Sequence, residues 1–98
     1  MQRMDELQRL ADMVAAVHFA GLPFQVYQET YQLNVTDVDG VVQSYYASTG
    51  TAIFRDGNNR YTQKRKTVKD MPFDEFLALC TGEKDIMEIY FNEGGFTT

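Results

Sequence analysis

The sequence contains few of the residues that build disulfides and metal sites. Among its 98 residues there is one cysteine, Cys80, one histidine, His18, and no tryptophan. A single cysteine excludes an internal disulfide and a cysteine-rich zinc site, so we expect no metal and no cofactor. Long hydrophobic runs are also lacking, and no segment approaches the roughly 20 apolar residues of a membrane-spanning helix. The first residues lack the basic and then apolar layout of a signal peptide, which predicts a cytoplasmic protein.

What the sequence does contain is enough apolar material for a core. Hydrophobic residues make up 44% of the chain, aromatic residues 13% and charged residues 23%. A disordered chain has fewer apolar residues than this. A domain of roughly 100 residues buries most of the surface that its unfolded chain exposes, and one core suffices for it. We therefore predict a single globular domain over residues 1–98.

Charge is distributed unevenly along the chain. The net charge of −5 combines −4 over residues 1–54, +5 over residues 55–69 and −6 over residues 70–98. One short basic block thus lies between two acidic segments, and this asymmetry is the feature of the sequence that says most about function. Within the block, Asp56 is the one acidic residue, and the basic residues are Arg55, Arg60, Lys64, Arg65, Lys66 and Lys69.

Apolar spacing predicts a helix near the N-terminus. Leu10, Val14 and Val17 recur every three or four residues, as they do on one face of an amphipathic helix. We expect this helix to span residues 4–20. It should end at the Gly21-Leu22-Pro23 sequence, because glycine accepts the left-handed capping conformation and proline cannot continue the helix.

The middle of the chain alternates with a period of two, which predicts strands. A first strand starts at Gln25 and ends before an Asp-Gly turn at residues 37–40. A second, long strand covers residues 41–55, with a bend at Ser48–Gly50, and a third covers residues 60–68. We therefore predict a three-stranded antiparallel meander.

Helical spacing returns in the C-terminal third of the chain. Phe73 and Phe76 lie on one helical face, and Gly82 is expected to end this helix. Residues 83–93 fit either a helix or a strand, and we favour a short helix closed by Gly94-Gly95. The predicted fold is α+β, with an N-terminal helix, the meander, a C-terminal helix and a short final helix or strand, and its helices pack on one face of the sheet.

Ser48, Thr49 and Gly50 raise the question of a reactive or phosphate-binding loop. A P-loop needs several glycines and a Lys-Ser/Thr pair that opens a helix, and neither follows Gly50. A serine nucleophile needs an adjacent base, and no motif links Ser48 to His18. We interpret the triplet as a bend, in which Gly50 adopts a backbone conformation that other residues avoid and makes a bulge or corner in the second strand.

The other candidate catalytic and metal-binding groups are interpreted as structural. His18 and Cys80 are the components of a thiol-imidazole dyad, but a lone cysteine on an apolar helix face is more often a core residue, and His18 flanks such a face. Asp37 and Asp39 resemble the start of a calcium loop, yet Gly40 and the lack of a later acidic ligand break the pattern. We predict no catalytic residue and no metal ligand.

Part of the chain resembles small uncharacterised proteins of phages and prophages. The similarity covers residues 45–80, where a Tyr-x-x-Ser/Thr-Thr-Gly stretch precedes a helix built on Phe-x-x-Phe-Leu. Such proteins often have proline where this chain has Ala47. The resemblance implies a mobile-element origin, and small acidic phage proteins include inhibitors of host defence such as anti-CRISPR proteins. The matching positions are Tyr45 or Tyr46, Ser48, Thr49, Gly50, Phe73, Phe76 and Leu77.

The acidic C-terminal segment supports the first function hypothesis. A negative face with an aromatic anchor would occupy a basic groove on an enzyme that handles nucleic acid. We therefore predict a non-enzymatic phage-type binding protein in the cytoplasm of the host cell. Its partner is a host protein, and inhibition of a host defence nuclease is the implied role. The residues assigned to this face are Asp85, Glu88, Tyr90 and Glu93.

The basic block supports an alternative, an accessory nucleic-acid-binding module that uses the hairpin 55–69. On the predicted third strand, Arg65 lies on one face and the other basic residues on the opposite face, with an aromatic ring nearby to stack on a base. The same residues suit a protected edge strand, because basic side chains on an exposed edge discourage pairing with another sheet. The residues assigned to nucleic acid are Arg60, Tyr61, Lys64, Arg65 and Lys66.

Overall fold

Helix α1 (Gln2–Ala20) begins the structure, a computed structural model that describes residues 2–91. Leu10 and Val17 are buried on one face of the helix, as the apolar spacing predicts, together with Met13. Gly21 follows in the left-handed conformation with a φ of 81°, which glycine adopts at little cost. The predicted N-terminal helix is therefore confirmed.

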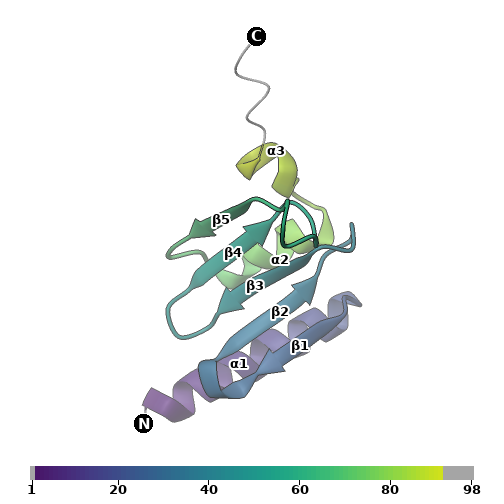
Figure 1. Ribbon diagram of the computed structural model, residues 1–98. Helices are drawn as coiled ribbons and strands as arrows, with labels where there is room; N and C mark the ends of the chain where they lie inside the picture. The colour runs from purple at the N-terminus through teal and green to yellow at the C-terminus, as the bar shows by residue number, and fades with distance from the viewer. Residues whose placement is uncertain (1, 92–98) are drawn as a thin grey trace.

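Five antiparallel strands form one sheet, and helices α1 and α2 lie behind it in Figure 1. The strand order is β1-β2-β3-β4-β5, so each strand lies next to the strand that follows it in sequence. The α+β class is confirmed, but the predicted number of three strands is wrong. The strands are β1 (Phe24–Tyr27), β2 (Gln32–Thr36), β3 (Val42–Tyr46), β4 (Thr51–Arg55) and β5 (Arg65–Val68).

The predicted first strand is two strands. A single 3-10 turn, η1 (Gln28–Thr30), separates β1 from β2, and Tyr31 follows it with a left-handed φ of 54°. The chain reverses here, so that Phe24 pairs with Val35. No glycine, proline or asparagine marks this turn, and the alternating pattern therefore gave no sign of it.

The predicted second strand is also two strands. Residues 47–50 form a tight turn, and Tyr46 pairs with Thr51 across a β3–β4 hairpin. The φ of Gly50 is 71°, which confirms the unusual conformation predicted for it. The Gly50 N–H donates to the Tyr46 carbonyl (2.8 Å), so this glycine closes a hairpin and does not bend one long strand.

The predicted third strand starts later than expected. β5 begins at Arg65, and the preceding residues form a connection, here called the 56–64 loop. Asp56 closes this loop, because its carboxylate accepts the Lys64 N–H (2.7 Å) and its own N–H donates to the Lys64 carbonyl (3.2 Å). Side-chain bonds of this kind compete with strand pairing. Arg60 and Lys64 therefore lie in a loop, and the prediction that they lie on a strand face is wrong.

Helix α2 (Phe73–Thr81) is the predicted C-terminal helix. It begins after Pro72 and ends at Gly82, whose φ of 88° allows the left-handed cap. Proline is tolerated at the start of a helix because the first N–H groups have no intrahelical partner. The buried side chains of α2 are Phe76, Leu79 and Cys80.

The final described element is a short helix, α3 (Ile86–Tyr90). Of the two conformations that the sequence allowed here, the favoured helix is therefore correct and the strand is not. The Asp85 carboxylate caps it by accepting the Glu88 N–H (3.2 Å). Gly94-Gly95, predicted to close this helix, lies outside the described residues.

The core lies between the sheet and the helices. Figure 1 shows α1 behind β1 and β2, and α2 behind β3 and β4. Phe54 and Phe76 are fully buried, with their ring centroids 5.7 Å apart, and each such side chain contributes about 1.5–3 kcal/mol by leaving water. The Tyr45 hydroxyl donates to the Met71 carbonyl (2.5 Å), which ties β3 to the connection between β5 and α2.

Replacement of Gly50 by alanine is expected to destabilise the fold by about 1–2 kcal/mol, the cost of a left-handed conformation for a residue with a side chain. A Cβ at this position would lie 3.6 Å from the nearest atom, the Met71 carbonyl oxygen, so the cost arises from the backbone and not from a clash. Gly57→Ala is the matched control, because Gly57 lacks a positive φ and faces open space. Urea unfolding measures both variants, and equal effects would contradict the role given to Gly50.

Candidate functional site

One face of the sheet lies under the helices and the other is not covered by them. Side chains alternate between the faces along each strand, and paired residues share a face. Leu33, Tyr45 and Ala52 form a paired and buried row on the helix side. The alternate residues point to the other side, here called the open face. Its central residues are Gln32, Asn34, Ser44, Tyr46, Ile53, Arg55 and Arg65.

A polar network crosses the centre of the open face. The Ser44 hydroxyl donates to Asn34 Oδ1 (2.8 Å), and Gln32 Nε2 donates to the same oxygen (2.9 Å). Arg55 Nη1 donates to Ser44 Oγ and to the Val42 carbonyl, both at 3.0 Å. These contacts bury Ser44 completely despite its position on the open face. The network therefore links β2, β3 and β4 through their side chains.

Two arginines lie opposite each other at one end of the open face. Arg55 on β4 pairs with Arg65 on β5, and like charges in opposed positions are destabilising. Burial lowers the pKa of the Arg55 guanidinium, the charge of Arg65 lowers it further, and Tyr46 acts in the opposite sense. An arginine nevertheless remains protonated at neutral pH. Neither arginine has an ion pair with a carboxylate in the part of the chain that the structure describes.

Acidic residues are segregated from this face. None of the five strands contains aspartate or glutamate. The α-helices carry several of the carboxylates instead, and the others lie in connections. The charge asymmetry of the sequence is therefore also a difference between two layers, a basic sheet and an acidic helical layer. The helical carboxylates of the described residues are Asp5, Glu6, Asp12, Asp74, Glu75 and Glu88.

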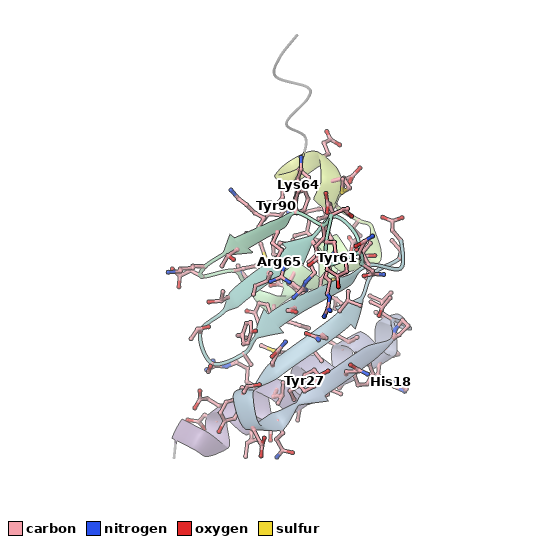
Figure 2. All side chains as sticks on the ribbon, in the orientation of Figure 1. His18, Tyr27, Tyr61, Lys64, Arg65 and Tyr90 are labelled. Atoms are coloured by element: carbon pink, nitrogen blue, oxygen red, sulfur yellow. The ribbon has the colours of Figure 1, made fainter. Side chains whose placement is uncertain are left out.

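The 56–64 loop adds basic and aromatic side chains next to the open face. Asn58 holds the loop in place, since its side-chain amide forms two hydrogen bonds with the backbone around the β2–β3 turn (2.7 and 3.1 Å). Tyr61 is 83% exposed, and the Arg60 guanidinium carbon lies 5.2 Å from its ring centroid. Figure 2 shows Tyr61 and Arg65 on the side of the sheet away from the helices.

Protection of a sheet edge explains only part of the basic block. β5 is an edge strand, so Arg65 and Lys66 suit that role. Lys66 pairs with the buried Phe54 and therefore points to the helix side, whereas Arg65 points to the open face. Arg55 lies on β4, which is not an edge, and the other edge strand, β1, has no charged residue at all. The opposed arginines therefore require a further explanation.

No protein-family model, curated protein or solved structure matches this chain. Its resemblance to phage and prophage proteins stays a prediction. Function is therefore inferred from the geometry of the chain itself.

The residues predicted to form an acidic face have different surroundings. Asp85 caps α3, and Glu88 is exposed one turn later. Tyr90 is half-buried and its ring stacks on Phe54, with centroids 4.9 Å apart and planes inclined by 12°. Burial raises the pKa of the Tyr90 hydroxyl, and the charge of Glu75 adds to this effect. Glu93, the remaining predicted residue, lies outside the described residues.

Two exposed apolar side chains on α3 were not predicted as functional. Met87 is 45% exposed and Ile89 is 52% exposed. The helix turns Ile86 and Tyr90, which are one turn apart, toward the core, so the residues between them point outward. The sequence alone did not decide between a helix and a strand here, and the exposed apolar residues differ between the two conformations. Only the observed helix shows which of them are exposed to solvent. The C-terminal side therefore presents a small apolar patch next to acidic residues.

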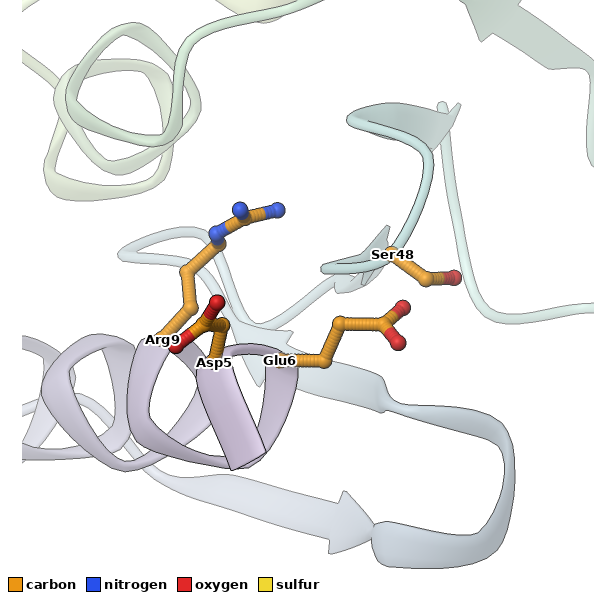
Figure 3. A pocket seen from close by; sticks show the side chains of 4 residues that line it. All are labelled: Asp5, Glu6, Arg9 and Ser48. Carbon is orange, nitrogen blue, oxygen red and sulfur yellow. The ribbon is translucent and has the colours of Figure 1, made fainter. Parts of the chain in front are cut away.

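The Ser48–Gly50 turn lies against helix α1 beside a shallow hollow, which Figure 3 shows from close by. Ser48 and the α1 residues Asp5, Glu6 and Arg9 line this hollow of about 370 Å³. Arg9 donates to the Ala47 carbonyl (3.1 Å) and so fastens the turn to the helix. None of the lining residues is a histidine, so Ser48 has no imidazole base there.

The other candidate chemical groups lie apart from this turn. Cys80 is buried, and burial raises the pKa of its thiol, which opposes formation of a thiolate nucleophile. His18 is exposed on α1, with its ring edge-on to Phe24 and the centroids 6.5 Å apart. Within residues 2–91, no group of three or more His, Cys, Asp or Glu side chains is placed to hold a metal ion. No helix in the same range is long and apolar enough to cross a membrane.

Asp37 is a turn residue, as predicted, and it also fixes the end of β4. Its Oδ1 accepts the N–H groups of Asp39 and Val41, both at 2.9 Å, and its Oδ2 accepts Gln43 Nε2 (3.0 Å). Gln43 is buried and binds both backbone groups of Arg55, accepting the N–H (2.6 Å) and donating to the carbonyl (3.0 Å). The position of Arg55 on the open face therefore depends on Gln43.

Proposed function

We propose that the protein is a non-enzymatic module that binds nucleic acid through the open face and the 56–64 loop. The observation that carries the proposal is the Arg55–Arg65 pair, whose guanidinium groups belong to opposed residues and have no carboxylate partner in the described residues. A phosphate group bound by both would offset their repulsion, and arginine binds phosphate with two parallel hydrogen bonds.

The distribution of charge supports the same proposal. A net charge of −5 would repel nucleic acid if it were spread evenly over the surface. The strands, however, contain basic residues and no acidic ones. Salt screens charges over about 10 Å at 0.1 M ionic strength. A ligand on the open face would therefore interact mainly with the nearby arginines and less with the carboxylates of the helical layer.

The non-enzymatic part of the proposal rests on the residue types of the open face and on the positions of Cys80 and His18. The open face contains neither cysteine nor histidine. Cys80 is buried in α2, and His18 is exposed on α1 beside Phe24. The phage origin and the host cytoplasm that the sequence predicts are compatible with a binding role, and both stay predictions.

Salt titration tests the proposal. The affinity for a fluorescein-labelled oligonucleotide, measured by anisotropy, is expected to fall steeply as salt rises, because bound arginines and lysines release counterions from the phosphates. For three or four phosphate contacts with a single strand, the logarithm of the affinity should fall by about 2–3 for each tenfold rise in salt. A failure to bind any oligonucleotide at about 0.05 M salt would contradict the proposed function.

A second candidate function is contact with a host protein, including a defence nuclease, through the C-terminal side. The observation that favours it is the pair of exposed apolar residues, Met87 and Ile89, which lie next to Asp85 and Glu88. Apolar centres with charged rims are typical of protein interfaces. Capture of a nuclease-resistant partner that the double reversal of Asp85 and Glu88 to lysine abolishes would favour this candidate over nucleic acid.

A further inference from the structure

We infer that the open face takes single-stranded nucleic acid in preference to duplex, an inference that rests on the proposed function. The face presents guanidinium groups, side-chain amides and an aromatic ring on neighbouring strands. Arg55 contacts Ser44, Ser44 contacts Asn34, and Asn34 contacts Gln32. Gln32 in turn pairs with Tyr46. These groups suit three features of an unpaired nucleotide. The guanidinium groups suit its phosphate, the amides suit the hydrogen-bonding edge of its base, and the aromatic ring suits the flat face of its base.

The amide groups retain hydrogen-bonding capacity. Asn34 Oδ1 accepts from both Gln32 and Ser44, which leaves the amide nitrogen of Asn34 and the side-chain oxygen of Gln32 without a partner among residues 2–91. A donor of Asn34 and an acceptor of Gln32 thus remain available on two half-buried side chains. Bases in a duplex already pair through their Watson–Crick edges, whereas an unpaired base has these edges available.

Aromatic side chains flank the amides on the same face. Gln32 pairs with Tyr27 on one side and with Tyr46 on the other, so the three residues form a row across β1, β2 and β3. Tyr27 is 45% exposed and Tyr46 is half-buried. Bases of single strands stack on aromatic rings at such surfaces, and the stacking tolerates any sequence because every base has a π face.

Duplex nucleic acid would use only the charge of this face. Its bases are stacked inside the helix, and direct readout requires an element that enters a groove, such as a helix or a two-stranded ribbon. The broad five-stranded sheet is not such an element. The side-chain amides of Gln32 and Asn34 and the ring of Tyr46 would therefore contribute to the affinity for a single strand and not to the affinity for a duplex.

The inference is tested with a labelled DNA strand of about 12 nucleotides and with the duplex that it forms with its complement. Tyr46→Leu is expected to lower the affinity for the strand about tenfold through loss of stacking and to leave the affinity for the duplex unchanged. Tyr46→Phe keeps the ring and should bind like the wild type, which separates stacking from misfolding. Phe19→Leu is the matched control, because Phe19 is 94% exposed and lies on helix α1.

Three results would overturn the inference. The first is that the wild type binds the single strand and the duplex equally, and the second is that Tyr46→Leu loses no affinity for the single strand. The third is that heparin binds as tightly as the single strand, which would indicate attraction to any polyanion. Nucleic-acid binding itself would survive the first two results. If neither strand nor duplex binds at low salt, the proposed function fails as well, so the two failures are distinguishable.

Discussion

Charge reversal at Arg65 is expected to lower the affinity for single-stranded DNA at least about tenfold, whereas the same reversal at Lys66 lowers it less than about threefold. The two residues are neighbours on β5, and both substitutions change the net charge equally. Arg65 points to the open face beside Arg55, however, and Lys66 pairs with Phe54 on the helix side. The comparison therefore separates a contact on one face from a general effect of charge.

Arg65→Glu should at the same time raise the stability of the protein by a few tenths of a kcal/mol. The new carboxylate would face Arg55, and opposite charges across a strand pair are stabilising. Thermal unfolding followed by circular dichroism measures this change, and anisotropy measures the loss of affinity. Equal losses of affinity in Arg65→Glu and Lys66→Glu would contradict the assignment of the site to the open face.

Replacement of Gln43 by leucine is expected to cost about 3 kcal/mol or more of unfolding free energy. Leucine fits the volume of glutamine but leaves three groups without their partner: the N–H and the carbonyl of Arg55 and the Oδ2 of Asp37. A buried polar group that loses its hydrogen bond costs about 1–3 kcal/mol. The change is measured by urea unfolding.

Gln8→Leu is the matched control for this substitution. Gln8 is exposed on α1 and bonds only Asp12, with Nε2 and Oδ1 3.0 Å apart, so its replacement should change the stability by less than about 0.5 kcal/mol. If Gln43→Leu were also within this range, Gln43 would not hold the end of β4. The affinity of Gln43→Leu for DNA should fall as well, since Arg55 is then displaced.

The helices could be predicted from the sequence because their signals are local. The apolar spacing of α1 and the glycines that end α1 and α2, Gly21 and Gly82, act within a few residues. The hairpin turn at residues 37–40 was equally clear, because an Asp-Gly pair marks it. Elements whose ends carry such residues were therefore assigned with the right type.

The strand count was wrong where a turn lacked those residues or was taken for a bend. The reversal at Gln28–Tyr31 depends on a left-handed tyrosine, which sequence preference disfavours. The Ser48–Gly50 turn has the expected glycine, but a bend and a reversal use the same residue type. Pairing between strands distinguishes them, and pairing is a property of the folded chain.

The candidate site was visible in the sequence only as a block of charge. The predicted set contained Arg65, Lys64 and Lys66 but not Arg55, because the register that places Arg55 opposite Arg65 depends on the length and conformation of the 56–64 loop that joins β4 to β5. Asn34 and Ser44 gave no signal at all, since polar residues on alternate strand positions are common. The Ser44 hydroxyl reaches Asn34, and the Arg55 guanidinium reaches Ser44, only when β2, β3 and β4 are side by side.

The most direct test of the open face as the binding site is an NMR titration of the ¹⁵N-labelled protein with a short DNA strand. The amide signals of the open face should shift, foremost those of Asn34, Ser44 and Arg55, together with those of the 56–64 loop, while those of α1 and α2 stay in place. Shifts confined to α3 or to the helical layer, or no shifts at saturating DNA and low salt, would contradict the account.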